Sequence, residues 1–154
     1  MNSMSFSPFI AFIKLPDTFE YEAYLVNPAN ILYERVVALT WGTSSDIDSM
    51  IETEKAIIEE GRLEPNSFIR LEKNRMGLLD YVLIYHLDLY PQNISVPVMV
   101  HCTLPKGHWE YPLRHLPILE REGMYIHLDA RPDNETVEEE AKHMVMESRF
   151  ITFD

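Results

Sequence analysis

The chain has 154 residues, 46% of them hydrophobic and 25% charged, which is the composition of one ordinary globular domain. Thirteen lysines and arginines stand against 25 aspartates and glutamates, a formal net charge of -12. This sign repels phosphate, so the sequence argues against nucleic acid and anionic membranes as partners. No apolar run approaches the roughly 18 residues that span a bilayer, which argues against a membrane-spanning helix.

Cysteine usage and the start of the chain bear on the compartment. The chain has one cysteine, Cys102, which cannot form a disulfide within the chain. The first residues lack the basic and long apolar regions of a secretion signal. We therefore expect a cytoplasmic protein.

In the first half of the chain, aromatic and β-branched residues gather in short segments. Turn-forming residues such as Pro16 and the run 27–30 separate these segments. The pattern predicts four strands, at 8–15, 19–27, 31–41 and 68–71.

The segment 46–60 fits two patterns. Its isoleucines and its methionine have partial helical spacing, and Gly61 follows the end, as is typical of a helix. The alternative is a polar loop over 42–49 followed by a strand over 52–60. The pattern slightly favours the strand, and both interpretations stay open.

The strongest alternation lies between Leu79 and Leu89, where the odd positions are leucine or tyrosine. This pattern predicts a half-buried strand. Its even positions include His86 and Asp88, so that side is the more polar one and is expected to face water.

The segment 96–104 alternates in the same way and follows a turn at 90–93. Pro97 has no N–H to donate, which places this strand at a sheet edge or starts it after the proline. A free edge along 98–104 would be open to strand addition by a partner.

The last third of the chain mixes irregular and helical patterns. Prolines and aromatic residues over 105–123 predict an irregular connection that packs on the surface. A short strand is predicted over 124–128. Thr136 and Glu139 form a capping-box pattern, which predicts a helix near 134–146. The apolar residues that recur at helical spacing there are Val137, Ala141, Met144 and Val145.

Short strands and frequent turns are typical of an antiparallel β-sandwich. We therefore predict a single mainly-β domain over 1–154, immunoglobulin-like or jelly-roll-like, with a short C-terminal helix. The irregular loop over 105–123 belongs to this domain, and no internal repeat interrupts it.

Strand and turn patterns at 19–27, 63–66 and 79–81 carry a resemblance to a known family. Over roughly residues 8–90 the chain resembles the Smr-associated-like β-sandwich domain, which is found beside Smr endonuclease domains. The resemblance implies an ancillary module, since the catalytic work of that family belongs to the adjoining Smr domain. The His-Gly-containing signature of the Smr domain is absent from this chain, and no functional residue is carried over.

The pair His86 and Asp88 is the strongest candidate for chemistry, because residues two apart on a strand project from one face. Such a pair is part of the facial triad that holds non-haem iron, and His127 or His101 could complete it. The alternative function is therefore a small metal-dependent enzyme. The polar side of an alternating strand is more often simply solvated, so no metal and no cofactor is expected.

Other reactive residue types have simple structural interpretations. The spacing of seven between His101, His108 and His115 is not that of a zinc site. Cys102 lies on the apolar side of its strand, where a free cysteine behaves as a small hydrophobic residue. The glutamates at 138–140 would solvate the predicted helix.

Trp109, Tyr111 and Leu113 cluster after the predicted edge strand, whose outward residues include Met99 and His101. In the simpler interpretation, this loop closes one open end of the sandwich. In the more specific one, the five residues form a surface for a partner. We predict a non-catalytic interaction or assembly module that binds another protein or associates with itself.

Overall fold

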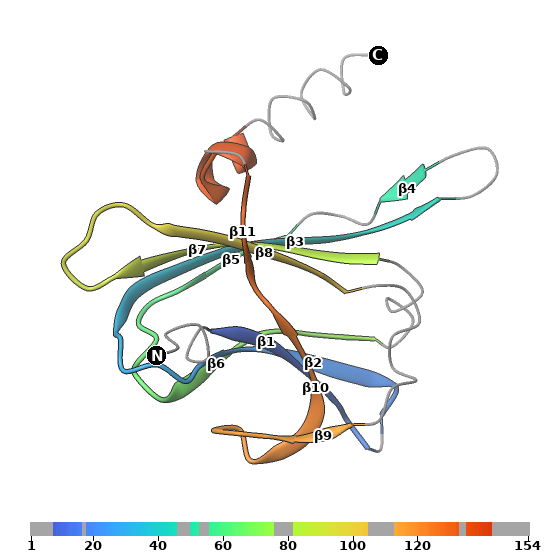
Figure 1. The fold of residues 1–154 in the computed structure, drawn as a ribbon. Helices are drawn as coiled ribbons and strands as arrows, with labels where there is room; N and C mark the ends of the chain where they lie inside the picture. Colours follow the sequence, from blue (N-terminus) through green and yellow to red (C-terminus); the bar gives the residue numbers. More distant parts are fainter. Residues whose placement is uncertain are drawn as a thin grey trace.

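The structure, a computed structural model, describes residues 8–16, 18–45, 50–52, 56–75, 82–104, 113–132 and 135–142. It consists of two antiparallel sheets packed face to face, with a short helix at 137–142 outside one of them (Figure 1). This confirms the predicted mainly-β, antiparallel sandwich with a C-terminal helix. No helix among the described residues is long and apolar enough to cross a membrane.

The first sheet has five strands in the order β6-β2-β1-β10-β9. These are β1 (Phe9–Lys14), β2 (Glu20–Asn27), β6 (Ser67–Arg75), β9 (Arg114–Leu116) and β10 (Arg121–His127). The second sheet has six strands in the order β11-β8-β7-β3-β4, and β5 also pairs with β3. These are β3 (Tyr33–Ser45), β4 (Met50–Glu52), β5 (Ala56–Glu60), β7 (Val82–Pro91), β8 (Val98–Leu104) and β11 (Asp129–Ala130).

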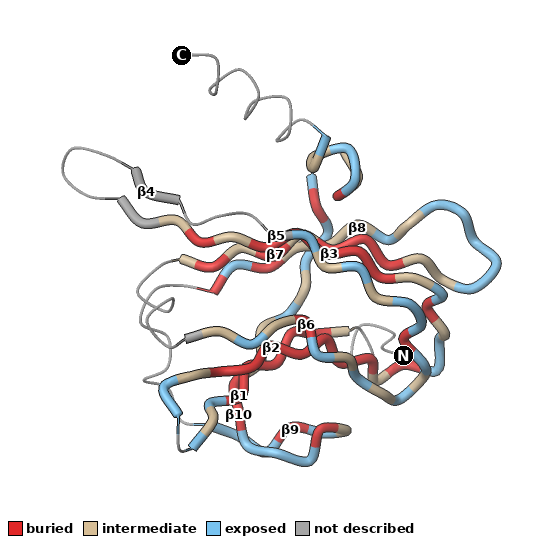
Figure 2. The backbone as a smooth tube through the Cα atoms, turned by 180° about the vertical axis from the view of Figure 1, so that it is seen from behind, coloured by how far each residue is buried: buried red, intermediate tan, exposed pale blue. Residues whose placement is uncertain are grey.

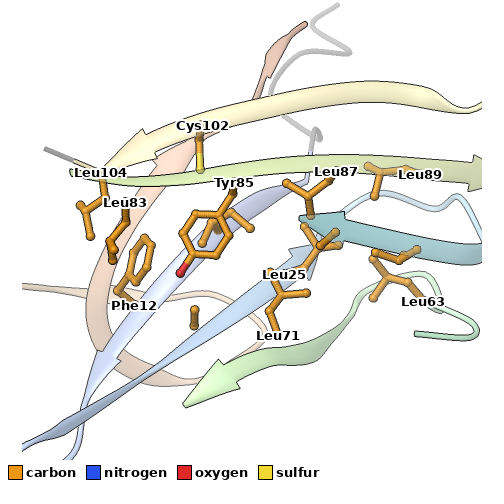
Figure 3. Close-up of a cluster of buried hydrophobic side chains, with 14 of the residues drawn as sticks. Phe12, Leu25, Leu63, Leu71, Leu83, Tyr85, Leu87, Leu89, Cys102 and Leu104 are labelled. Carbon is orange, nitrogen blue, oxygen red and sulfur yellow. The ribbon is translucent and has the colours of Figure 1, made fainter. Parts of the chain in front are cut away.

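The core lies between the sheets and is built from alternate side chains of their central strands (Figure 2). The inward residues of β7 are the odd positions, as the alternation predicts. The ring of Tyr85 packs against Phe12 of β1 with 5.8 Å between centroids (Figure 3). The same cluster contains leucines of both sheets and Leu63, which lies between β5 and β6: Leu25, Leu63, Leu71, Leu83, Leu87, Leu89 and Leu104.

The helical interpretation of 46–60 is wrong for the residues that the structure describes there. Ala56–Glu60 form β5, which pairs with β3 from Val36 to Thr40, so the predicted strand is confirmed over this part. The expected loop from 42 is shorter, because β3 continues to Ser45 and pairs with β4. Backbone hydrogen bonds to β3 outweigh the weak helical spacing of the isoleucines.

The prediction of an irregular connection over 105–123 is wrong from residue 114 onward, where β9 and β10 form a hairpin. Residues 105–112 lie outside the described residues. Pro117 sits in the turn, where its missing N–H costs no ladder bond. Ile118 and Glu120 close the turn at positive φ of 70° and 53°. The strand predicted at 124–128 is the second half of β10.

The free edge predicted along 98–104 is partly covered. As expected from Pro97, β8 begins at Val98. However, β11 pairs with β8 at His101 and Val100, and the Arg131 N–H donates to the Met99 carbonyl at 3.1 Å. The chain passes from β10 in one sheet to β11 in the other within one residue, and this crossover brings the C-terminal segment to the edge of the second sheet.

The capping box is confirmed. The Thr136 N–H donates to Glu139 Oε1 at 2.9 Å, and the Glu139 N–H donates to Thr136 Oγ1 at 3.2 Å. The described helix covers 137–142, so 143–146 of the predicted helix lie outside the described residues. This short helix packs on the sheet through Val137, which is fully buried.

Candidate functional site

Polar and apolar groups meet the C-terminal helix on the outer face of the second sheet. We call this surface the docking face. It consists of Arg35, Val37, Leu39 and Trp41 on β3, Ile84, His86, Asp88 and Tyr90 on β7, and Met99 and His101 on β8. All of them project away from the sandwich core because strand side chains alternate. Val137 of the helix packs on Val37 and Leu39.

The prediction that this side of β7 faces water is wrong. Asp88 is 0% exposed, and His86 keeps only 19% of its side chain exposed. The helix and the segment before it cover the sheet here (Figure 1). Alternation on a strand tells the two faces apart, but it does not tell whether another element covers the polar one.

Asp88 joins β7 to the helix. Its Oδ2 accepts a hydrogen bond from the Val137 N–H at 2.8 Å, and its Oδ1 lies 3.2 Å from Arg131 Nη1. Burial raises the pKa of Asp88 above its ordinary value, although the Val137 N–H and the Arg131 charge both act to lower it. Because it accepts the hydrogen bond from the Val137 N–H, the Asp88 carboxylate is an extra cap at the helix N-terminus.

Arg131 is the residue that holds this segment in place. Besides Asp88, its guanidinium donates to the Leu87 carbonyl at 3.4 Å and to the carbonyl of Glu135. It is 7% exposed, which is rare for an arginine. The sequence reasoning missed Arg131, and a lone arginine before a proline carries no local signal for burial.

His86 contacts the helix farther along. Its Nδ1 lies 2.9 Å from Glu140 Oε1 and 3.2 Å from Oε2. Its ring meets Trp41 edge to face at 5.1 Å and His101 at 6.2 Å, between ring centroids. His86 and Asp88 thus bind two different partners.

The alternative metal site is not assembled. His127 is exposed on β10 of the other sheet, where its ring packs on Tyr125 at 5.2 Å. Among the described residues, no group of three or more histidine, cysteine or acidic side chains could hold a metal ion. The arrangement of His86 and Asp88 is that of a helix clamp.

A third charged contact lies at the start of β3. Arg35 Nη2 is 3.1 Å from Glu138 and its Nε is 2.9 Å from Glu59 of β5, while its guanidinium stacks 5.4 Å from the Tyr90 ring centroid. These carboxylates raise the pKa of Arg35. Glu138 and Glu140, expected only to solvate the helix, therefore bind Arg35 and His86 of the docking face.

The predicted partner surface is divided by the fold. Met99 and His101 are half-buried and belong to the docking face. Leu113 is 42% exposed and precedes β9 at the edge of the other sheet. Trp109 and Tyr111 lie outside the described residues.

A second polar cluster lies inside the sandwich. Between Ala23↔Glu72 and Tyr24↔Arg70, β6 carries one extra residue, a β-bulge that turns Glu72 inward. There Glu72 accepts hydrogen bonds from the Tyr85 hydroxyl and, at 2.7 Å, from Asn74. Burial raises the pKa of Glu72 and of Tyr85. A bulge of this kind has no sequence signal in a single chain.

Cys102 is buried in the core beside this cluster, as expected for a small hydrophobic residue. Burial raises the pKa of its thiol to about 12, with a smaller contribution from the charge of Asp129. The thiolate, which is the nucleophilic form, is therefore scarce near neutral pH.

Comparison with protein-family models and with curated proteins found no match for this chain. The resemblance to the Smr-associated-like domain therefore stays a prediction.

Proposed function

We propose that this protein is a non-catalytic protein-interaction module whose binding site is the docking face. The observation that carries the proposal is the pairing of Arg35 with Glu138 and of His86 with Glu140 around the buried Val137. The partner that this surface fits is an acidic amphipathic helix, and in the isolated chain the C-terminal helix occupies the site.

The charge distribution supports this choice. The chain carries a net charge of -12, so a surface that holds acidic side chains has to bring basic groups together locally. On the docking face these are Arg35 and His86, while Val37 and Leu39 offer an apolar seat between them. A helix with one aliphatic residue and two glutamates per turn matches this surface, because the aliphatic side chain fits the apolar seat and the glutamates reach Arg35 and His86.

The outer charged contact of the bound helix is weak, whereas Asp88 and the buried Val137 hold its first turn. Arg35 and Glu138 keep 35% and 50% of their side chains exposed, and pairs of this kind contribute about 0–1 kcal/mol. A tethered helix nevertheless competes at an effective concentration on the order of millimolar. A partner therefore binds tightly only when its helix offers more contacts or when the chain's own helix is released.

The test is to release the helix and add it back as a separate peptide. In the full chain, Val137→Asp places a charge in the apolar seat and should undock the helix. A fluorescent peptide of residues 131–146 should then bind this variant more tightly than the unmodified chain, measured by fluorescence anisotropy. The control peptide carries Glu138→Lys and Glu140→Lys and should not bind.

Three results separate the outcomes. Binding of the first peptide but not of the control supports an acidic-helix site. Equal binding of both peptides, or of neither, to a variant with the circular dichroism of the sandwich contradicts the proposal. A dimer of the unmodified chain in sedimentation experiments that is lost in Val137→Asp would identify a second copy of the chain as the source of the helix.

A further inference from the structure

Three loops meet at one end of the sandwich, and the buried side chain of Asn27 ties two of them together. Its Nδ2 donates to the Ile31 carbonyl at 2.8 Å and to the Glu64 carbonyl at 3.0 Å. The third loop is held by the Gln92 N–H, which donates to the Leu32 carbonyl at 2.9 Å. A surface fixed in this way loses little conformational entropy when it binds. We call this surface the loop end, and it consists of residues 28–32, 61–66 and 92–98.

Exposed aliphatic side chains gather at the loop end. Of the eight large hydrophobic residues that are exposed in the described part of the chain, four belong to it: Ile31, Ile94, Val96 and Val98. The most exposed of these four is Val96, at 68%. Single exposed hydrophobic residues are ordinary, but a group of them on one surface is typical of an interaction site.

The exposure of Val98 follows from the length of the β7–β8 hairpin. Farther along β8, Val100, Cys102 and Leu104 pack in the core, and Val98 projects from the same side of the strand. The tip of the hairpin extends beyond the strands of the first sheet in both views, and Figure 2 shows it as exposed (Figures 1 and 2). The apolar side of β8 therefore continues past the core onto the surface.

The loop end has no net charge, unlike the chain as a whole. Its two charged residues are Arg62 and Glu64, of opposite sign, and Arg62 Nε lies 3.0 Å from Glu64 Oε2. The whole chain has a formal net charge of -12, so two copies repel each other wherever acidic surfaces meet. A foreign partner recognised by electrostatic complementarity would leave unpaired charges on the surface that binds it. A neutral aliphatic surface is instead complementary to a second copy of itself.

We propose that two copies of this chain associate through the loop end, with Ile94, Val96 and Val98 of one copy packed against the same group of residues in the other. A two-fold symmetric contact places one surface on both sides, which is what this neutral aliphatic group fits. The contact uses none of the residues of the docking face. It can therefore be tested separately from the proposed function.

Sedimentation equilibrium of the full chain, from about 1 μM to about 1 mM, covers the affinities of small interfaces. The unmodified chain should dimerise, and Val96→Asp should raise the Kd by about tenfold or more, because each copy then buries a charge. Ile94→Asp should act in the same way. The matched control is Phe19→Asp, at a position 78% exposed in the β1–β2 turn at the opposite end of these strands, which should leave the Kd unchanged. Circular dichroism checks that each variant keeps the sandwich.

Salt and the docking-face variant separate this contact from others. Raising the ionic strength from about 0.02 M to about 0.5 M should tighten the dimer, because salt screens the repulsion between acidic copies and leaves an apolar contact intact. Val137→Asp should leave the Kd of this dimer unchanged. The proposal is overturned if the unmodified chain is a monomer at about 1 mM, or if Val96→Asp and Phe19→Asp dimerise equally. A dimer that weakens with salt, or that is lost in Val137→Asp, would equally contradict it.

Discussion

The carboxylate of Asp88 accepts a hydrogen bond from the backbone N–H of Val137 at 2.8 Å, across 49 residues of chain. The same carboxylate faces the buried guanidinium of Arg131 at 3.2 Å. One acidic residue in the middle of β7 therefore both caps the C-terminal helix and neutralises the arginine that holds the preceding segment. The second sheet and the chain end form one unit through this residue.

Replacing Asp88 should be among the most destabilising single changes outside the apolar core. Asp88→Ala takes the carboxylate from a buried guanidinium and the acceptor from the Val137 N–H, which should lower the free energy of unfolding by about 3–5 kcal/mol. Urea unfolding followed by circular dichroism measures the loss. Asp129→Asn, on the exposed β11, is the control and should stay within about 0.5 kcal/mol. A loss below about 1 kcal/mol in Asp88→Ala would refute the clamp.

Glu72 and Glu22 should respond to pH in opposite directions. Burial raises the pKa of Glu72, so the folded state binds its proton more tightly than the unfolded state does. The stability that this proton contributes is present below the ordinary pKa of 4.5 and is lost as pH rises through the raised value. Relative to Glu72→Gln, the unmodified chain should therefore gain stability as pH falls.

Glu22 provides the matched comparison. Burial alone would raise its pKa, but hydrogen bonds from Tyr24 and Arg70 and the charge of Arg121 lower it below the ordinary value. Its contribution is present above pH 4.5 and is lost as pH falls through the lowered pKa. The cost of Glu22→Gln should thus shrink toward low pH. Urea midpoints at several pH values measure both variants, and curves that move in the same direction would contradict the assignment.

Gly123 should not tolerate a side chain. A Cβ at this position would lie 2.5 Å from Ile13 Cδ1 and 2.7 Å from the Phe12 carbonyl oxygen. Gly123 lies where the pairing of β10 with β9 ends and its pairing with β1 begins. The clash with backbone cannot be relieved by a rotamer change, so Gly123→Ala should cost about 1–3 kcal/mol. Gly61→Ala meets nothing within 4 Å and should leave the melting temperature almost unchanged. Equal melting temperatures for the two variants would show that the close approach is absent.

Cys102 should be unreactive in the folded protein. Its thiol is buried, and its pKa of about 12 leaves little thiolate at pH 8. A disulfide reagent should therefore label it at the rate of unfolding, and at once in denaturant. In a Cys102→Ala chain, Ile94→Cys, at a position 54% exposed, should react immediately under native conditions. Rapid labelling of native Cys102 would mean that this part of the sandwich opens readily.

Much of the first sheet and the centre of the second could be predicted from the sequence. Alternation from Leu83 to Leu89 determined which side chains of β7 enter the core, because period two is a local property of an extended chain. Proline and asparagine positions marked turns such as the one at Asn93, whose φ is 64°. The capping box of Thr136 was equally local, since it needs only residues one helical turn apart.

Only the tertiary structure decided that the C-terminal helix covers the outer face of the second sheet. Whether His86 and Asp88 meet water or a helix depends on where β11 leads the chain, and no spacing along β7 contains that information. The inward turn of Glu72 likewise depends on a bulge between paired strands. Sequence by itself determined the periodicity of each strand, which depends on neighbours in the chain. The fold decided which polar side chains are buried, because burial depends on residues far away in the sequence.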